Sequence, residues 1–289
     1  MRLGSKHLDL SVPQVMGILN ITPDSFSDGG ELMTDGRPAL AAIIDRAAHM
    51  VAAGATLLDI GGESTRPGAK LVTSDEEIDR VMPVLDALVA RFDAVLSIDT
   101  SNAVLIKLIG PAGAGLINDI RALQSPGALQ AAADSGLAIC LMHMQGMPAT
   151  MQQAPVYRDV VGDILDFLRQ RIAACIDAGI ATDRLLIDPG FGFGKTLEHN
   201  LDLLARLREL AALELPLLVG VSRKRMLGAI TGRSEKQREA AGIAAAMLAM
   251  QNGARIIRTH DVAGTVDAVK IWKAVHDVEC KQRLTAAGE

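Results

Sequence analysis

The stretch SDEEIDRVMPVLDALVARFDAVLSID, residues 74–99, contains the unit from which the fold is predicted. Apolar residues recur with helical spacing over residues 74–90, and AVLSI at residues 94–98 is a short apolar run of the kind that forms a buried strand. This run leads directly into Asp99, a charged residue. A helix followed by such a strand is typical of α/β proteins with parallel strands.

The same alternation of strand and helix recurs along the whole chain. Apolar runs predict eight strands, at residues 15–19, 56–60, 94–98, 115–119, 137–142, 184–188, 216–221 and 254–258. Helical periodicity predicts helices at residues 38–53, 74–90, 102–109, 126–135, 159–178, 197–211, 236–252 and 262–277. Eight strand–helix units in about 250 residues fit a closed (β/α)8 barrel, the α/β TIM-barrel fold.

We expect one domain over residues 1–289, with the barrel at about residues 14–278. The alternative architecture is an open, doubly wound α/β sheet. Such sheets often carry a Gly-rich turn that binds nucleotides, and the sequence has no G-x-G-x-x-G motif. The closed barrel is therefore the preferred fold.

Local signals mark several helix boundaries. Ser74 precedes Glu77 by three residues, the spacing of a capping box at a helix N-terminus. Four glycines follow predicted helices, at the place where a left-handed residue commonly ends a helix: Gly54, Gly136, Gly179 and Gly253.

The composition excludes several classes of protein. The chain has 289 residues, with 29 Lys and Arg against 34 Asp and Glu, and its formal net charge of −5 argues against a general nucleic-acid binder. No apolar run reaches the roughly 18 residues that span a bilayer, and the first residues lack the pattern of a signal peptide. The three cysteines form no C-x-x-C pair and predict neither disulfides nor a zinc site. We therefore expect a cytoplasmic protein with reduced thiols.

Aromatic residues make up only 2% of the chain, so the core must be built from aliphatic side chains. Phe26, Phe191 and Phe193 lie in Gly- and Pro-rich segments, where side chains that fill the core are not expected. The predicted helix at residues 236–252 contains AAGIAAAMLAM, which is small and apolar on nearly all sides. Since outer helices of a barrel normally keep a polar face, we expect this helix to contact a second subunit in a homodimer.

Polar residues stand at the ends of all eight predicted strands, where barrel enzymes carry their functional groups. They are Asn20, Asp59, Asp99, Asn118, His143, Asp188, Ser222 and His260. Any one of them alone could cap a turn or a helix, and for Asp59 this structural interpretation is as good as a functional one. Ordinary turns would not require all eight, so together they predict a binding site at one mouth of the barrel.

Hydrogen-bond acceptors and cations are predicted to meet at this mouth. Asp99, Asn118 and Asp188 supply acceptors. The cationic or titratable residues near the strand ends are Arg66, Lys195, Lys224, Arg258 and His260. This set suits a ligand with a planar, donor-rich edge, such as a 2-amino-4-oxo-pyrimidine, and an anionic group at its other end. The last strand end, where Arg258 and His260 lie, is a frequent phosphate site in barrels.

The loops at residues 22–30 and 61–69 combine Gly, Pro, Ser and Asp, and a surface turn would not require the Phe26 and Arg66 that they carry. We expect both loops to close over a substrate. PGFGFGK at residues 189–195 lacks the spacing of a phosphate-binding loop, and we expect Phe193 to offer its ring face to a planar substrate.

Eight segments, in order and at the family spacing, resemble those of the dihydropteroate synthases, the pterin-binding enzymes that sulfonamides target. The segments are GILNITPDSFSDGG, LLDIGGESTRPGA, LSIDTSN, GLINDIRAL, MHMQGMPATMQ, LLIDPGFGFGK, LLVGVSRKRMLGAI and RTHDV. The resemblance covers about residues 15–275. It implies a transferase of folate biosynthesis that condenses 6-hydroxymethyl-7,8-dihydropterin pyrophosphate with p-aminobenzoate, giving 7,8-dihydropteroate and pyrophosphate.

The resemblance also implies a role for each site residue. The residues implied to bind the pterin are Asp99, Asn118, Asp188 and Lys224. Those implied for p-aminobenzoate and the loops over it are Phe26, Thr65, Arg66, Pro67, Phe193 and Ser222. Those implied for pyrophosphate are Asn20, Arg66, Arg258 and His260, and Asn20 is also the expected ligand of a Mg²⁺ cofactor. Sulfonamides are expected to compete with p-aminobenzoate.

The implied reaction needs a good leaving group rather than a protein nucleophile, and the sequence shows no Ser-His-Asp or Cys-His arrangement. Mg²⁺, Arg258 and His260 are expected to stabilise charge on the departing pyrophosphate. Asp99 and Asp188 are expected to stabilise positive charge on the pterin before the aryl amine attacks. With Lys224, these side chains are the predicted catalytic residues.

Two alternatives share parts of this site. A pterin-dependent methyltransferase on the same barrel would share Asp99, Asn118 and Asp188 but would have no use for the anion site. A protein that only binds pterins would keep the pocket and should have lost Asn20 or the loop residues, all of which are present.

Overall fold

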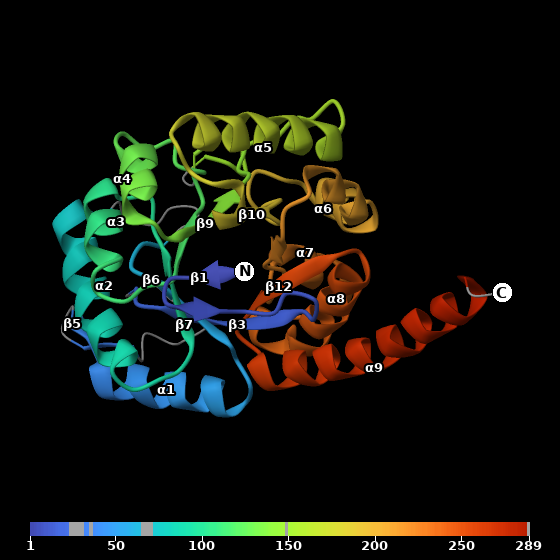
Figure 1. Cartoon of the computed structure of the whole chain (residues 1–289), viewed down its shortest axis with the longest axis horizontal. Coiled ribbons are helices and arrows are strands. Elements are labelled where there is room, and N and C mark those ends of the chain that lie inside the picture. Colours follow the sequence, from blue (N-terminus) through green and yellow to red (C-terminus); the bar gives the residue numbers. More distant parts are fainter. Residues whose placement is uncertain (23–31, 35–36, 65–71, 148–149, 288–289) are drawn as a thin grey trace.

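Eight parallel strands form a closed barrel in the computed structural model, which describes residues 1–22, 32–34, 37–64, 72–147 and 150–287 (Figure 1). The strands pair in the order in which they follow one another along the chain, and β12 closes the barrel on β3. They are β3 (Gln14–Asn20), β6 (Leu57–Gly61), β7 (Val95–Asp99), β8 (Leu116–Asp119), β9 (Ala138–Met142), β10 (Leu185–Asp188), β11 (Leu217–Val219) and β12 (Ala254–Thr259). The predicted (β/α)8 TIM-barrel fold is confirmed.

Helices surround the barrel as an outer ring (Figure 1). They are α1 (Leu40–Ala52), α2 (Ser74–Val89), α3 (Ala103–Ile109), α4 (Ala128–Ser135), α5 (Val160–Asp177), α6 (Leu197–Ala205), α7 (Arg225–Thr231), α8 (Glu239–Gln251) and α9 (Val262–Ala287). Short 3-10 helices lie at Thr182–Arg184, Leu207–Leu213 and Glu235–Gln237. No helix in the described part of the chain is long and apolar enough to cross a membrane.

A hairpin of the first residues packs against one end of the barrel. Side chains near the starts of the strands form a buried interior cluster, which contains Met16, Leu57, Val95, Leu116, Ala138, Cys140, Leu186, Leu218 and Ile256. Leu3 belongs to the same cluster and comes from the hairpin of β1 (Arg2–Leu3) and β2 (Lys6–His7). Lys6 Nζ donates to Ala94 O at 2.9 Å, which fixes the hairpin beside the start of β7. Because the hairpin covers the strand starts, the open mouth lies at the strand ends.

All eight predicted strands and the eight predicted helices are found, with small shifts at their ends. The predicted helix at residues 197–211 is divided into α6 and a 3-10 helix, and the last helix runs on to Ala287. The elements that were not predicted include α7, the 3-10 helix Thr182–Arg184 and the small hairpins β1–β2 and β4–β5, the latter formed by Met33–Thr34 and Arg37–Pro38. The four glycines at predicted helix ends all have positive φ, as expected.

Two local predictions are wrong. The capping box of α2 is made by Thr73 and Glu76 rather than by Ser74 and Glu77, because the preceding residue adopts the extended conformation that a cap requires. Phe191 is a core residue, only 1% exposed, although its Gly-rich surroundings argued against this.

Candidate active site

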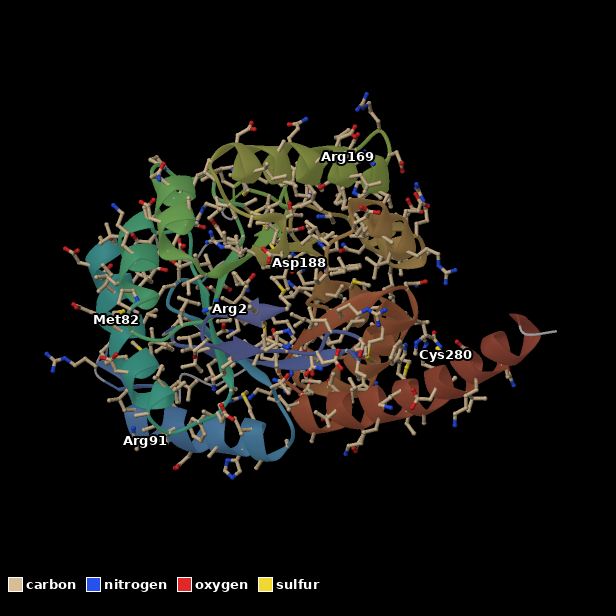
Figure 2. All side chains as sticks on the ribbon, in the orientation of Figure 1. Arg2, Met82, Arg91, Arg169, Asp188 and Cys280 are labelled. Carbon is tan, nitrogen blue, oxygen red and sulfur yellow. The ribbon has the colours of Figure 1, made fainter. Side chains whose placement is uncertain are left out.

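The strand ends surround a pocket of about 820 Å³. Figure 2 shows Asp188 near the middle of the ring of helices, whereas Arg91 and Arg169 lie toward its outer edge. Nine of the thirteen residues to which the resemblance gives a role line this pocket: Asn20, Asp99, Asn118, Asp188, Phe193, Ser222, Lys224, Arg258 and His260. The other four lie outside the described residues, and they are Phe26, Thr65, Arg66 and Pro67.

Asp188, at the end of β10, is a buried carboxylate of the pocket wall. Its Oδ1 accepts a hydrogen bond from Gly190 N at 2.7 Å, which fixes its orientation. Gly190 has a φ of 71°, and a Cβ atom there would lie 1.9 Å from His143 O, so this turn requires glycine. Burial raises the pKa of Asp188 to about 6, and the bond from Gly190 opposes the rise. At neutral pH the ionised carboxylate can accept hydrogen bonds from a ligand.

Arg258, which lines the pocket, connects two carboxylates, Asp59 and Asp99. Its Nε donates to Asp59 Oδ2 at 2.6 Å, and a terminal nitrogen donates to Asp99 Oδ2 at 3.2 Å. Asp59 is fully buried and also accepts from Ser97 Oγ at 2.5 Å and from Asn118 Nδ2 at 3.2 Å. Burial raises the pKa of Asp99 to about 7, and the charge of Arg258 opposes this rise. The network joins the side chains of Arg258, Asp99 and Asn118 through Asp59, and its members come from four strands.

Asp59 is a member of this network that was predicted at the mouth of the barrel by its strand-end position but was given no role in binding or catalysis. Its position at a strand end was equally compatible with a structural role in a turn and with a functional role in the site. Its three hydrogen bonds and its complete burial decide for a supporting role under the pocket. The available signal was the apolar sequence on both sides of Asp59, which predicts that this carboxylate is buried. A buried carboxylate needs hydrogen-bond partners, and Arg258, Ser97 and Asn118 provide them.

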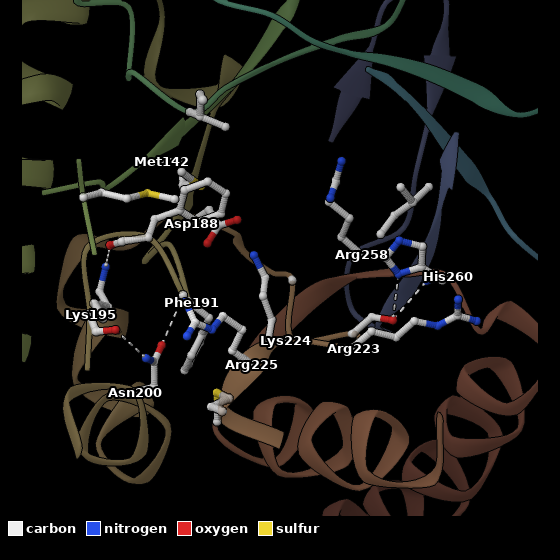
Figure 3. A pocket seen from close by; sticks show the side chains of 18 of the residues that line it. Met142, Asp188, Phe191, Lys195, Asn200, Arg223, Lys224, Arg225, Arg258 and His260 are labelled. Atoms are coloured by element: carbon white, nitrogen blue, oxygen red, sulfur yellow. Dashed lines mark hydrogen bonds between the residues drawn. The ribbon is translucent and has the colours of Figure 1, made fainter. Parts of the chain in front are cut away.

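Lys224 brings a cation to the middle of the pocket. Its Nζ lies 4.2 Å from the centre of the Phe193 ring, a cation–π distance. Burial lowers the pKa of Lys224 to about 8, the positive charge of Arg258 adds to this, and Asp188 opposes it. Figure 3 shows Lys224 extending toward Asp188, with Arg258 and His260 on the side of β12.

Lys195, from the PGFGFGK segment, is buried and acts as an internal brace. Its Nζ donates to Gly190 O at 2.9 Å and to Phe193 O at 3.1 Å, and it lies 3.0 Å from His143 Nδ1. Burial lowers the pKa of His143 to about 2, so the ring is neutral and can accept from Lys195. These bonds hold the loop that carries Phe193, a role that the sequence alone did not indicate.

His260 and Ser222 form the side of the pocket next to β12. Ser222 Oγ lies 3.1 Å from His260 Nδ1 and accepts from His260 N at 3.2 Å. Burial, and then the positive charges of Arg223 and Arg258, hold the pKa of His260 well below its ordinary value. The imidazole is therefore neutral in the free protein, and an anion bound beside it would favour the protonated form.

The described residues contain no group of three or more His, Cys, Asp and Glu side chains that could hold a metal ion. Asn20 Oδ1 and Asp99 Oδ2 nevertheless both lie near Gly61 at the strand ends. A Cβ atom on Gly61 would be 3.4 Å from Asn20 Oδ1 and 3.9 Å from Asp99 Oδ2. One amide oxygen beside a carboxylate fits Mg²⁺, which prefers oxygen ligands and keeps several waters or substrate oxygens.

The pocket therefore combines two kinds of recognition. Asp188, Asn118 and Asp99 present acceptors that suit a planar edge of N–H groups. Arg258, His260 and Lys224 supply positive or protonatable groups that suit an anion within the same pocket. A ligand with both features would be bound at its two ends. The bond that joins these two ends would then remain accessible to a second substrate.

Comparison with known proteins agrees with this site. The model of the family described as pterin binding enzyme matches residues 16–260. The dihydropteroate synthase of Escherichia coli K12 is 52% identical over 267 residues, which cover 92% of this chain and 93% of that protein.

Solved structures show the same similarity in three dimensions. A crystal structure of the Yersinia pestis dihydropteroate synthase with a sulfonamide drug complex is 55% identical and has a TM-score of 0.92, and the match covers 96% of this chain and 99% of that chain. The Xanthomonas albilineans dihydropteroate synthase in complex with 7,8-dihydropteroate is 44% identical, with a TM-score of 0.81, and covers 93% of this chain and 95% of that chain.

Proposed function

We infer that this chain, which belongs to the pterin-binding enzyme family, is a transferase that catalyses the dihydropteroate synthase reaction. It condenses 6-hydroxymethyl-7,8-dihydropterin pyrophosphate with p-aminobenzoate and releases pyrophosphate. The observation that carries this conclusion is the meeting of Asp188, Asn118 and Asp99 with Lys224 and Arg258 in one pocket.

The acceptor side of the pocket would bind the pterin. The 2-amino-4-oxo edge of the ring offers adjacent N–H groups, which a carboxylate such as Asp188 can accept in parallel. Asn118 can both donate and accept, so it can read a ring nitrogen and a ring N–H. Asp188 is held by Gly190 N, and Asn118 by Asp59, so both are oriented before the substrate arrives.

The cationic side would hold the pyrophosphate. Arg258 is fixed by Asp59 and Asp99, and His260 by Ser222, so neither group must reorganise as charge develops on the leaving group. Asn20 is the proposed protein ligand of Mg²⁺, which would supply positive charge to the departing pyrophosphate. As the C–O bond breaks, Asp99 and Asp188 would stabilise positive charge on the pterin.

p-Aminobenzoate would bind on the side of the pocket that carries Phe193 and Ser222. Thr65, Pro67 and the loop residues Phe26 and Arg66 are proposed to belong to the same subsite. The Phe193 ring offers an apolar face, and Ser222 offers a hydroxyl to the carboxylate of the substrate. Sulfonamides share the aryl amine and an acidic group, so we propose that they compete for this subsite. The sulfonamide complex of the similar Yersinia pestis enzyme supports this proposal.

A pterin-dependent methyltransferase is the weaker alternative. It would use Asp99, Asn118 and Asp188, but it would not need Arg258 and His260 arranged as an anion site. The relatives reported above are dihydropteroate synthases, which also favours the condensation.

We further propose that the enzyme works as a homodimer in the cytoplasm. On the outer helices, Leu248 of α8 is 49% exposed, and Ile271, Val275 and Val278 of α9 are more than half exposed. Residues 271, 275 and 278 repeat at helical spacing, so they form one apolar stripe that a second copy can cover. The three cysteines are free thiols, in keeping with a reducing compartment. Sedimentation velocity would detect the dimer, and a monomer at micromolar concentration would contradict it.

The reaction is tested by mixing both substrates with the protein and Mg²⁺ and measuring pyrophosphate. We expect one pyrophosphate for each 7,8-dihydropteroate formed, and none when p-aminobenzoate is omitted. Transfer of a methyl group from methyltetrahydrofolate to a corrinoid, without pyrophosphate release, would instead establish the alternative.

A further inference from the structure

The turn after β11 holds a strained residue between two pocket side chains. Arg223 has a φ of 55°, in the left-handed region that a residue with a long side chain rarely adopts. Its neighbours Ser222 and Lys224 both line the pocket. The left-handed turn determines the directions in which these two neighbours point, so whatever holds Arg223 also holds them.

Two contacts hold Arg223 in this conformation. Its Nε and a terminal nitrogen donate to the two carboxylate oxygens of Asp261, at 3.3 and 2.5 Å. Its carbonyl oxygen accepts from a terminal nitrogen of Arg238 at 3.0 Å. The Arg238 guanidinium lies against Gly228, where a Cβ atom would come within 2.3 Å of it, so the close approach depends on that glycine. The side chain of Arg223 is thus anchored by Asp261 and its backbone by Arg238, and these two residues lie in different segments of the chain.

Asp261 lies on the next segment of the site, directly after His260. Its Oδ2 is 3.5 Å from Ser222 Oγ, and the His260 backbone N–H donates to the same hydroxyl. Its own backbone N–H donates to Thr259 Oγ1 at 3.0 Å, which fixes it to the end of β12. The Asp261 side chain is only 7% exposed, so solvent screens the ion pair weakly.

The ion pair therefore joins two halves of the site. The segment after β11 carries Ser222 and Lys224, which face p-aminobenzoate and the pterin in the proposed function. The segment after β12 carries His260, which faces the pyrophosphate. β11 and β12 are bonded neighbours whose pairing reaches Val219 and Ile257, so Ser222, Arg223, His260 and Asp261 lie beyond the paired residues.

We propose that the Arg223–Asp261 ion pair is a positioning element, which sets the distance between the attacking-amine side and the leaving-group side of the pocket. This inference rests on the proposed function. Asp261 does not line the pocket, so it acts through Arg223, Ser222 and His260 rather than by touching substrate.

The test compares the Asp261→Asn variant with the wild-type enzyme and with a matched control variant. The control is Asp267→Asn, which removes an equivalent carboxylate from the exposed Lys270–Asp267 pair on α9. For Asp261→Asn we expect kcat to fall about tenfold to a hundredfold and the KM for p-aminobenzoate to rise. Pterin affinity by calorimetry should fall less than kcat does, because Lys224 is displaced while Asp188 and Asn118 lie on other strands. The control should match the wild type in all three values.

A second pair of variants separates positioning from folding. Arg223→Lys keeps the charge but loses the bidentate geometry, and Arg223→Asn keeps tolerance for a left-handed backbone but loses the charge. We expect Arg223→Lys to retain the thermal midpoint and still lose at least fivefold in kcat. The double variant Arg223→Asn with Asp261→Asn should be no slower than the slower of the two single variants, because each single variant already removes the same ion pair.

The outcomes distinguish this inference from the proposed function. If the wild type releases no pyrophosphate, the proposed function is wrong. If the wild type is active but Asp261→Asn and Arg223→Lys both match the control, the positioning role is wrong while the function stands. Equal losses in kcat, p-aminobenzoate binding and pterin binding would also overturn the positioning role, since they indicate general damage.

Discussion

Replacing Asp59 with Asn tests whether the buried network supports the pocket. Asp59 is fully buried and accepts hydrogen bonds from Arg258, Ser97 and Asn118. The amide has one acceptor oxygen, and its NH₂ group would face donors, so at least one of the three bonds is lost. The charge that balances Arg258 is lost as well.

The size of the effect follows from these contacts. Removing one partner of a buried ion pair costs about 3–5 kcal/mol, and a hydrogen bond to a charged group contributes about 1.5–3 kcal/mol. Arg258 keeps its second partner Asp99 at 3.2 Å, so we expect the free energy of unfolding to fall by about 2–4 kcal/mol. With a denaturant slope of about 3 kcal/mol per M for a chain of this size, the urea midpoint should fall by about 1 M.

The assay is urea unfolding followed by circular dichroism, with pyrophosphate release measured on the folded variant. Asp93→Asn is the matched control, because Asp93 pairs with Lys6 at 2.7 Å and is fully exposed, and its midpoint should not change. The folded Asp59→Asn enzyme should also turn over more slowly, since Arg258 loses its orientation. A midpoint for Asp59→Asn equal to that of the control would refute the reasoning.

Four further predictions concern the pocket itself. Asp99→Asn should weaken pterin binding about tenfold, because an acceptor pair becomes a mixed donor and acceptor; calorimetry that shows unchanged affinity would count against this role. His260→Ala should lower kcat more than pterin affinity, and equal effects on both would indicate ground-state binding only. Inhibition by a sulfonamide should be relieved by excess p-aminobenzoate, and inhibition that persists would reject a shared subsite. Because ionised Asp99 and Asp188 and charged Lys224 are needed, kcat/KM should fall as pH drops through about 7 and about 6 and as it rises through about 8, whereas a flat profile from pH 5 to 9 would contradict these assignments.

The barrel could be predicted because its strands are buried on both faces. Runs such as AVLSI and LAICLM are almost wholly apolar, and each is bounded by polar turns, so their number and order are readable from the chain. The hairpin β1–β2 gave no such signal, since each strand has only two residues and its stability comes from Leu3 packing under the barrel. The short helix α7 is likewise fixed by its surroundings rather than by a long periodic pattern.

Site positions were predictable where a strand ended in a polar residue, but the partners of these residues were not. Lys195 could be placed near the mouth from its segment, yet its bonds to Gly190, Phe193 and His143 depend on the geometry of a folded loop. The pairing of Arg223 with Asp261 joins positions 38 residues apart, and a charge count does not reveal it. The choice of Thr73 over Ser74 as the cap of α2 depends on backbone angles that neighbouring residues set.

A crystal structure with the pterin pyrophosphate bound would show whether the pocket holds both ends of this substrate as proposed. We expect the ring edge within hydrogen-bond distance of Asp188 and Asn118, and the phosphates beside Arg258 and His260. A ligand bound elsewhere on the barrel, or one whose phosphates point away from Arg258 and His260, would contradict this expectation.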